Sequence, residues 1–88
     1  MLKPVYLRSF EYELEKAKKR GFDISKLKVV INDLIHEKPL AEKHRNHKLK
    51  GNFIGYWECH ITPDWLLIYK KDKEKIYFAR MGTHADLF

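Results

Sequence analysis

Histidines are the residues of this sequence whose chemistry suggests a function. There are five, and His47, His60 and His84 are expected near the ends of structural elements or in the loops that follow them. Histidine titrates near neutral pH, so it can give or take a proton during a reaction. His36 is expected at a helix end and His44 in a basic loop, where an ordinary surface role suffices. Convergence of the other three on one side of a sheet would mark a site.

Cleavage of RNA through its ribose 2′-hydroxyl needs a base, an acid and positive charge near the phosphate. Glu58 and Asp64 can act as a base or fix the tautomer of a histidine, and Arg80 can grip a phosphate through two hydrogen bonds. Trp65 and Phe88 offer flat faces on which an unstacked base can lie. The ordinary alternatives for these two are a core tryptophan and a frayed terminal phenylalanine.

Metal chemistry is not expected from the sequence. Cys59, His60 and Asp64 are close together, but a strand followed by a turn does not converge them as a helix would. The paired Cys or His spacing of a zinc site, a glycine-rich phosphate loop and a nucleophile elbow are all absent from the sequence. We therefore expect no metal and no other cofactor.

The composition is that of a small basic domain. Its 88 residues, 44% hydrophobic and 14% aromatic, suffice for one core, and we expect a single domain over residues 1–88. The net charge of +6 favours a polyanionic partner, although lysine-rich surfaces also keep small proteins in solution. One cysteine excludes an intrachain disulfide, and neither a signal peptide nor a membrane span is recognisable. A cytoplasmic protein without membrane contact is the expectation.

Two helices are expected in the first half of the chain, because apolar residues recur there at three- and four-residue spacing. The first apolar stripe comprises Leu7, Phe10, Leu14 and Ala17. The second comprises Leu27, Val30, Ile31 and Leu34. Gly21 is a typical helix end, Asp23 can cap the second helix, and Pro39 follows it. The short connection predicts an antiparallel helical hairpin that covers one face of a sheet.

The apolar period changes to two in the second half, which predicts strands. The predicted strands are residues 54–61, 65–69 and 76–80, with residues 2–6 as an additional edge strand. Turns at Pro63–Asp64 and Asp72–Glu74 make the three consecutive strands an antiparallel meander. The pattern predicts an α+β fold.

The register across the turns decides which side chains share a face. If residues 62 and 65 flank the first turn, His60 lies opposite Leu67; the second turn then places Phe78 beside Leu67 and Arg80 beside Trp65. The side chains predicted to face the helices are Trp57, Cys59, Ile61, Leu66, Ile68, Tyr77 and Ala79. Those predicted on the opposite face are Glu58, His60, Trp65 and Arg80. A slip of one residue would reverse the assignment.

Three strings, in order and at fitting separations, resemble the YafQ branch of the RelE/ParE toxin superfamily. They are NHKLKG at 46–51, CHITPDWLLIY at 59–69 and RMGTHADLF at 80–88. The resemblance extends over essentially the whole chain. It implies a RelE-like α+β fold, with an N-terminal helical hairpin on one face of a small antiparallel sheet in the order β-α-α-β-β-β.

The resemblance also implies a function. It implies the toxin of a type II toxin–antitoxin system, which cleaves messenger RNA in the ribosomal A site without a metal and is blocked by a cognate antitoxin wrapped over its basic groove. His84 is the expected general acid, and His60, with Asp64 nearby, the expected base. The other positions carried over from the family are His47, Arg80 for the phosphate, and Trp65 and Phe88 for the base. Contacts to RNA are also expected from Arg45, Lys48 and Lys50.

Three positions depart from the pattern common among relatives. Asn46 stands where an acidic residue is frequent, Phe53 in place of a tryptophan and Trp57 in place of an arginine. They bear on the orientation of His47 and on one contact to RNA or antitoxin. Two other functions stay open: a gyrase-inhibiting ParE-like toxin, which shares the fold without the histidines, and a basic RNA-binding module that leaves RNA uncut.

Overall fold

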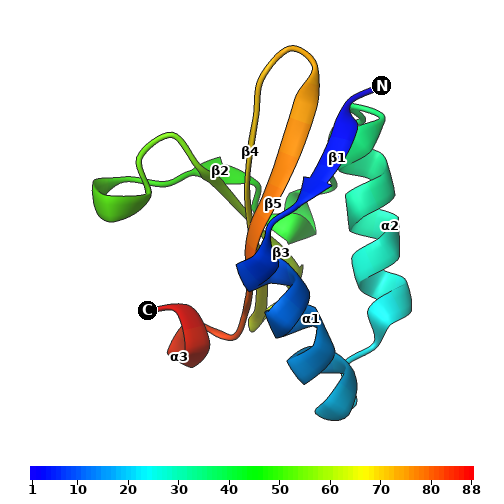
Figure 1. Ribbon diagram of the computed structural model, residues 1–88, viewed down its shortest axis with the longest axis vertical. Helices are drawn as coiled ribbons and strands as arrows, with labels where there is room; N and C mark the ends of the chain where they lie inside the picture. The colour runs from blue at the N-terminus through cyan, green and yellow to red at the C-terminus, as the bar shows by residue number, and fades with distance from the viewer.

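A five-stranded mixed sheet with a helical hairpin on one side makes up this computed structural model, which describes all 88 residues (Figure 1). The elements are β1 (Lys3–Tyr6), α1 (Arg8–Lys19), α2 (Ile24–Ile35), η1 (Glu42–His44), β2 (His47–Lys48), η2 (Gly51–Phe53), β3 (Trp57–Thr62), β4 (Trp65–Lys71), β5 (Lys75–Gly82) and α3 (His84–Leu87), η1 and η2 being 3₁₀ helices. The strand order is β1-β5-β4-β3-β2. The predicted α+β fold is confirmed. Strand β1 runs parallel to β5, whereas the other pairs are antiparallel, and β2 and α3 add to the predicted order.

Helix α1 buries Phe10 and Ala17 and ends where the sequence predicts. Its last turn closes as a Schellman motif: the N–H of Phe22 donates to the carbonyl of Ala17 (3.0 Å), and the N–H of Gly21 to that of Lys18 (3.2 Å). Gly21 has a φ of 80°, a left-handed conformation that favours glycine. The chain therefore reverses sharply after α1.

Helix α2 begins directly after this reversal. Asp23 is its N-cap, as predicted, and its Oδ1 accepts a hydrogen bond from the N–H of Ser25 at 3.1 Å. The buried stripe comprises Leu27, Val30 and Leu34. Neither this helix nor any other is long and apolar enough to cross a membrane. The two helices lie on the same side of the sheet (Figure 1).

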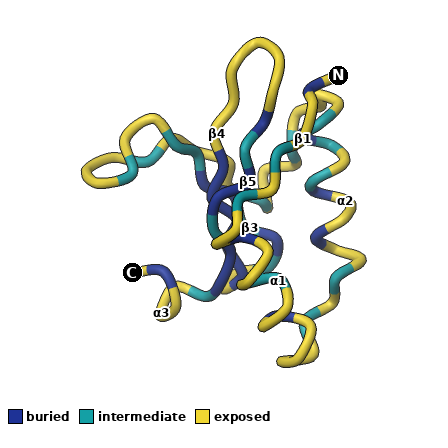
Figure 2. The backbone as a smooth tube through the Cα atoms, in the orientation of Figure 1, coloured by how far each residue is buried: buried dark blue, intermediate teal, exposed yellow.

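Burial is greatest in the three central strands, β3, β4 and β5 (Figure 2). The main core lies between the helical hairpin and the sheet and includes Phe10, Leu27, Cys59, Leu67 and Phe78. A smaller cluster of Leu66, Ile68 and Leu87 forms on the other face, where α3 covers part of the sheet. Both faces of β4 are therefore buried.

The register between β3 and β4 departs from the prediction at one residue. Thr62 pairs with Trp65, as predicted, but a bulge leaves Ile61 unpaired. His60 consequently pairs with Leu66, one residue earlier than predicted. An extra residue in one strand inverts the faces of its partner strand, because side chains alternate with a period of two.

The faces predicted for β4 are therefore wrong, although those of β3 are confirmed. Leu67 and Tyr69 face the helices, and Leu66 and Ile68 the opposite side. Trp65 packs in the main core with 3% of its surface exposed. Its predicted role as an open surface for a base is contradicted by this burial.

A second bulge displaces the register of β5. Tyr69 pairs with Phe78 and Ile68 with Arg80, which leaves Ala79 unpaired. The neighbours predicted for Phe78 and Arg80 are wrong. Between the turn and the bulge the register already differs from the predicted one by two residues, and the bulge adds a third.

Candidate active site

Glu58 is a charged side chain buried on the face of the sheet away from the helices, with 5% of its surface exposed. Its Oε1 lies 3.5 Å from Nε2 of His60, two residues along β3, and 3.5 Å from Nε2 of His47, its partner in β2. A buried carboxylate needs hydrogen bonds or an opposite charge. Each imidazole forms an ion pair with Glu58 when it is protonated.

Backbone carbonyls hold the other ring nitrogen of these two histidines. Nδ1 of His47 lies 2.6 Å from the carbonyl oxygen of Arg45, and Nδ1 of His60 lies 3.3 Å from that of Pro63. A carbonyl oxygen only accepts, so Nδ1 carries a hydrogen in both rings. Nε2 is therefore the ring nitrogen left without a hydrogen in the neutral imidazole, and it is the atom that faces Glu58.

His84 is held in the same way by a carboxylate. It is the first residue of α3, and its Nδ1 lies 2.6 Å from Oδ1 of Asp64 in the turn between β3 and β4. The backbone N–H of His84 donates to the same oxygen at 3.0 Å. These hydrogen bonds, the backbone one first, lower the pKa of Asp64 below its ordinary value. Asp64 is therefore ionised at neutral pH and can stabilise a protonated His84.

The three histidines lie close to one another. The ring centroid of His60 is 6.4 Å from that of His47 and 5.7 Å from that of His84. The structure thus brings together three imidazoles, two of them beside Glu58 and the third beside Asp64. Imidazoles at this spacing can deliver a proton to one atom of a bound phosphodiester and remove a proton from another.

Two sequence expectations about the charged partners need correction. Asp64 hydrogen-bonds to His84 rather than to His60, whose carboxylate neighbour is Glu58. Arg80 binds a carboxylate of α1: its Nε and Nη2 donate to Oε1 and Oε2 of Glu13 at 2.8 and 2.9 Å. These hydrogen bonds raise the pKa of Arg80. Its charge is paired with that of Glu13 on α1.

Aromatic side chains flank the histidines at the C-terminal end of the chain. Phe88 is 63% exposed, and its ring meets that of Phe53 edge-on at 5.8 Å between centroids. Phe53 also meets Tyr56 edge-on at 6.2 Å. Sequence reasoning singled out Phe88 but missed its contact with Phe53, because η2 and α3 are distant in sequence. The only sequence signal that pointed to Phe53 was its departure from the tryptophan common at this position in the family.

The basic segment before β3 has both structural and exposed side chains. His44 donates from Nδ1 to the backbone carbonyl of His60 at 2.6 Å, a link that sequence reasoning missed. Asn46 accepts a hydrogen bond from the hydroxyl of Tyr69 at 2.6 Å. Lys48 places Nζ 5.5 Å from the centre of the Trp57 ring. The remaining basic side chains, Arg45 and Lys50, are exposed.

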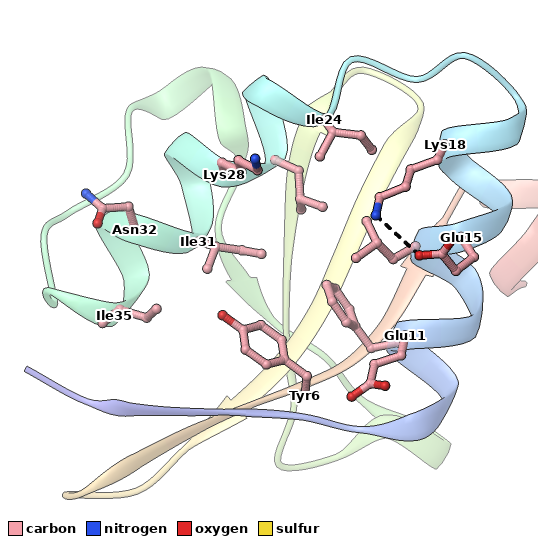
Figure 3. A pocket seen from close by; sticks show the side chains of 12 residues that line it. Tyr6, Glu11, Glu15, Lys18, Ile24, Lys28, Ile31, Asn32 and Ile35 are labelled. Carbon is pink, nitrogen blue, oxygen red and sulfur yellow. Dashed lines mark hydrogen bonds and ion pairs between the residues drawn. The ribbon is translucent and has the colours of Figure 1, made fainter.

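A groove of about 690 Å³ lies between α1 and α2, on the helical side of the molecule. Figure 3 shows Tyr6, Ile24 and Ile31 lining it, with the ion pair of Lys18 and Glu15 (3.2 Å) at its rim. None of the histidines lines this groove. It is separate from the candidate active site.

A helical hairpin on one face of a mixed sheet, with three oriented imidazoles on the other side, defines a small α+β protein equipped for acid–base chemistry. Residues 2–88 match the family described as "Bacterial toxin of type II toxin-antitoxin system, YafQ". The chain belongs to this YafQ family.

Individual relatives agree over nearly the full chain. The mRNA interferase toxin YafQ of Escherichia coli K12 is 39% identical over 84 residues, which cover 94% of this chain and 91% of the relative. The crystal structure of YafQ from Escherichia coli BL21(DE3) has a TM-score of 0.95 at 36% identity, covering 100% and 99% of the two chains. In the crystal structure of the Escherichia coli DinJ-YafQ toxin-antitoxin complex, the similar chain has a TM-score of 0.92 at 38% identity, with 99% and 97% covered.

Proposed function

We propose that this protein is a messenger RNA interferase, an endoribonuclease toxin that cuts messenger RNA in the ribosomal A site without a metal. The observation that carries the proposal is the orientation of the three histidines: Nδ1 of each lies against an acceptor, so Nε2 is the ring nitrogen that can take or give a proton. The relative from Escherichia coli, described as an mRNA interferase, supports the same activity. Cleavage of ribosome-bound message assigns the protein to the cytoplasm.

The reaction needs one proton to leave a 2′-hydroxyl and one to reach the departing oxygen. We assign His60 as the base: its Nε2 takes the 2′-hydroxyl proton as the 2′-oxygen attacks the neighbouring phosphorus. The bond from phosphorus to the 5′-oxygen breaks, and protonated His84 gives its Nε2 proton to that oxygen. The products are a 2′,3′-cyclic phosphate and a 5′-hydroxyl end. Glu58 stabilises the protonated His60, and Asp64 the protonated His84 before transfer.

Positive charge near the phosphate comes from His47 and the basic segment around it. Protonated His47 lies next to His60 and shares Glu58 with it. Arg45, Lys48 and Lys50 supply fixed charge for the RNA backbone, in keeping with the net charge of +6. Phe88, exposed and braced by Phe53, provides a face for a base. Arg80 holds β5 to α1 through Glu13, so we assign it no direct contact with RNA.

The partner we propose is a cognate antitoxin protein. The solved complex of a similar chain with DinJ, described as a toxin-antitoxin complex, supports this assignment. An antitoxin segment over the histidines and the basic side chains around β2 would exclude RNA from them. Acidic side chains in that segment would suit the positive charge around β2.

The experiment that tests the function maps the 5′ ends of messenger RNA in a bacterial translation reaction. It compares the wild-type protein with His84→Ala, and reactions with ribosomes to reactions without them. Cuts that need ribosomes and vanish with His84→Ala are expected. A wild-type protein that stops growth but cuts nothing would exclude the nuclease and favour the binding or gyrase-directed functions.

A further inference from the structure

Arg20, at the end of α1, reaches across the molecule to α3. Its Nη1 donates to Oδ2 of Asp86 at 2.8 Å, although 66 residues separate the two in sequence. We propose that Arg20 and Asp86 are positioning residues for His84, which fix the turn that carries its imidazole. This inference rests on the proposed function, in which His84 supplies a proton.

Asp86 organises the turn directly before His84. Its Oδ2 accepts a hydrogen bond from the backbone N–H of Thr83 at 2.9 Å, and its own N–H donates to the hydroxyl of Thr83 at 3.2 Å. This reciprocal pair is a capping box. Helix α3 has only four residues, and so short a helix is not stable by itself. The carboxylate that caps α3 therefore needs an outside anchor, and Arg20 provides it.

Gly82 lets this carboxylate approach the backbone. A Cβ atom at Gly82 would lie 2.9 Å from Cβ of Asp86 and 3.1 Å from its Oδ2. Real side chains do not tolerate the first of these contacts, so a larger residue here would push Asp86 away. Gly82 is therefore needed for the hydrogen bond between the Asp86 carboxylate and the backbone of Thr83.

Arg20 is itself anchored to the core. It is the C-cap residue of α1, immediately before the left-handed Gly21. Its guanidinium lies 4.9 Å from the centre of the Phe22 ring, which meets buried Trp65 edge-on at 4.9 Å. The contacts run from Trp65 through Phe22 and Arg20 to Asp86. They tie the turn before His84 to the main core.

The position of His84 depends on such support because its own hydrogen bond is exposed. The side chains of His84 and Asp64 are 55% and 66% exposed, and an exposed pair fixes geometry weakly. A displacement of about 1 Å can lower a catalysed rate by about a hundredfold. The N–H of Phe88 also donates to the carbonyl of His84 at 2.9 Å, so loosening α3 would move Phe88 as well.

The test measures two properties of Arg20→Gln, Asp86→Asn and the double variant. The first is the single-turnover rate of ribosome-bound mRNA cleavage, measured together with the ribosome concentration at half-saturation. The second is the tautomer of His84, read from its ring nitrogens in a long-range ¹H–¹⁵N NMR spectrum. Lys19→Gln removes a neighbouring charge as the control, and Arg20→Lys is the conservative variant.

We expect each single variant to lower the rate about tenfold at unchanged half-saturation, with no further loss in the double variant. Arg20→Lys should retain most of the rate, and Lys19→Gln all of it. The His84 ring should change from one tautomer, with Nδ1 protonated, to a mixture. If circular dichroism shows that Arg20→Gln is unfolded, the cleavage rates and His84 spectra of Asp86→Asn and Arg20→Lys decide whether Arg20 and Asp86 position His84.

Wild-type rates in both single variants would overturn the inference. So would a lower rate with an unchanged His84 spectrum, or a change confined to half-saturation, which would make Arg20 a direct RNA contact. The NMR measurement needs no RNA. If the wild-type protein cuts nothing, the proposed function fails, and the His84 spectrum still decides whether Arg20 and Asp86 position the ring.

Discussion

Asp64 accepts two hydrogen bonds from His84 through a single oxygen. Its Oδ1 lies 2.6 Å from the ring Nδ1 and 3.0 Å from the backbone nitrogen. One carboxylate oxygen thus contacts both the backbone and the ring of His84 and selects the tautomer with Nδ1 protonated. The two donors, the backbone first, hold the pKa of Asp64 below its ordinary value, so Asp64 is ionised wherever cleavage would be assayed.

Replacement of Asp64 by asparagine should therefore slow cleavage more than it weakens binding. An amide can donate or accept, so it no longer selects the tautomer of His84 with Nδ1 protonated. We expect the single-turnover rate to fall roughly tenfold to a hundredfold. Asp72→Asn is the matched control, because backbone hydrogen bonds also lower the pKa of Asp72, in the turn between β4 and β5. Equal rates for Asp64→Asn and the wild type would contradict the role.

The variant Glu58→Gln tests the shared carboxylate beside His47 and His60. Glutamine has nearly the same shape, so the fold should persist, but it cannot balance a protonated imidazole at 3.5 Å. We expect cleavage to slow by about tenfold or more, with a far-UV circular dichroism spectrum like that of the wild type. Glu74→Gln, an exposed carboxylate in a turn, is the control. An unchanged rate in Glu58→Gln would remove Glu58 from the site.

Much of the fold could be predicted from local sequence patterns. Helix ends at Gly21 and Asp23 follow from glycine's left-handed conformation and from side-chain capping, which act within a few residues. Both bulges were missed, and each moved a register by one residue. No local signal marks the unpaired Ile61 or Ala79. The burial of Trp65 follows from the first of them.

The candidate site could be predicted in its residue types but not in its pairing. His47, His60 and His84 come together, as the motifs suggested, because β2 pairs with β3 and the turn after β3 meets the start of α3. Which carboxylate meets which imidazole depends on register and on the turn after β3, which motifs do not encode. The partner of Arg80 lies on α1, 67 residues away, so no spacing along the chain could indicate it.

Cys59 should be inert in the folded protein. It is fully buried under the helices, and burial, followed by the negative charge of Glu58, raises the pKa of its thiol to about 12. The reactive thiolate is therefore scarce at neutral pH. We expect iodoacetamide at about pH 8 to leave the native protein unmodified and to alkylate the urea-unfolded chain at the rate of a free cysteine. Fast alkylation of native protein would show that the core opens readily.

Two aromatic variants separate a core role from an RNA role. Trp65→Ala should lower the free energy of unfolding by about 3–5 kcal/mol, because a buried tryptophan leaves a large cavity. Phe88→Ala should change it by less than about 0.5 kcal/mol, since the ring is exposed. It should weaken RNA engagement by about 1–3 kcal/mol if a base stacks there. Urea unfolding and half-saturation for cleavage measure the two effects.

Trp65→Phe is the matched control for this pair. It keeps an apolar ring in the core, so cleavage by the folded variant should remain close to that of the wild type. A folded Trp65→Phe protein that binds the ribosome normally but does not cut would restore a direct contact between Trp65 and RNA.

The stability of the protein should depend on pH through Asp86. Hydrogen bonds from the backbone of Thr83 and then from Arg20 hold the pKa of Asp86 at about 2, against 3.8 for a free side chain. A pKa that is lower in the folded state means that the unfolded chain binds the proton more tightly. The contribution of Asp86 is therefore complete above about pH 4 and is lost as the pH falls toward about 2.

We expect Asp86→Asn to lower the free energy of unfolding by about 1 kcal/mol at neutral pH, and the difference from the wild type to shrink across this window. Urea unfolding at neutral pH and at about pH 3 measures it, with Asp33→Asn, a half-buried carboxylate of α2, as the control. A difference that does not change with pH would mean that Asp86 titrates alike in the folded and unfolded chains, and the ion pair with Arg20 would then contribute nothing to the hold on α3.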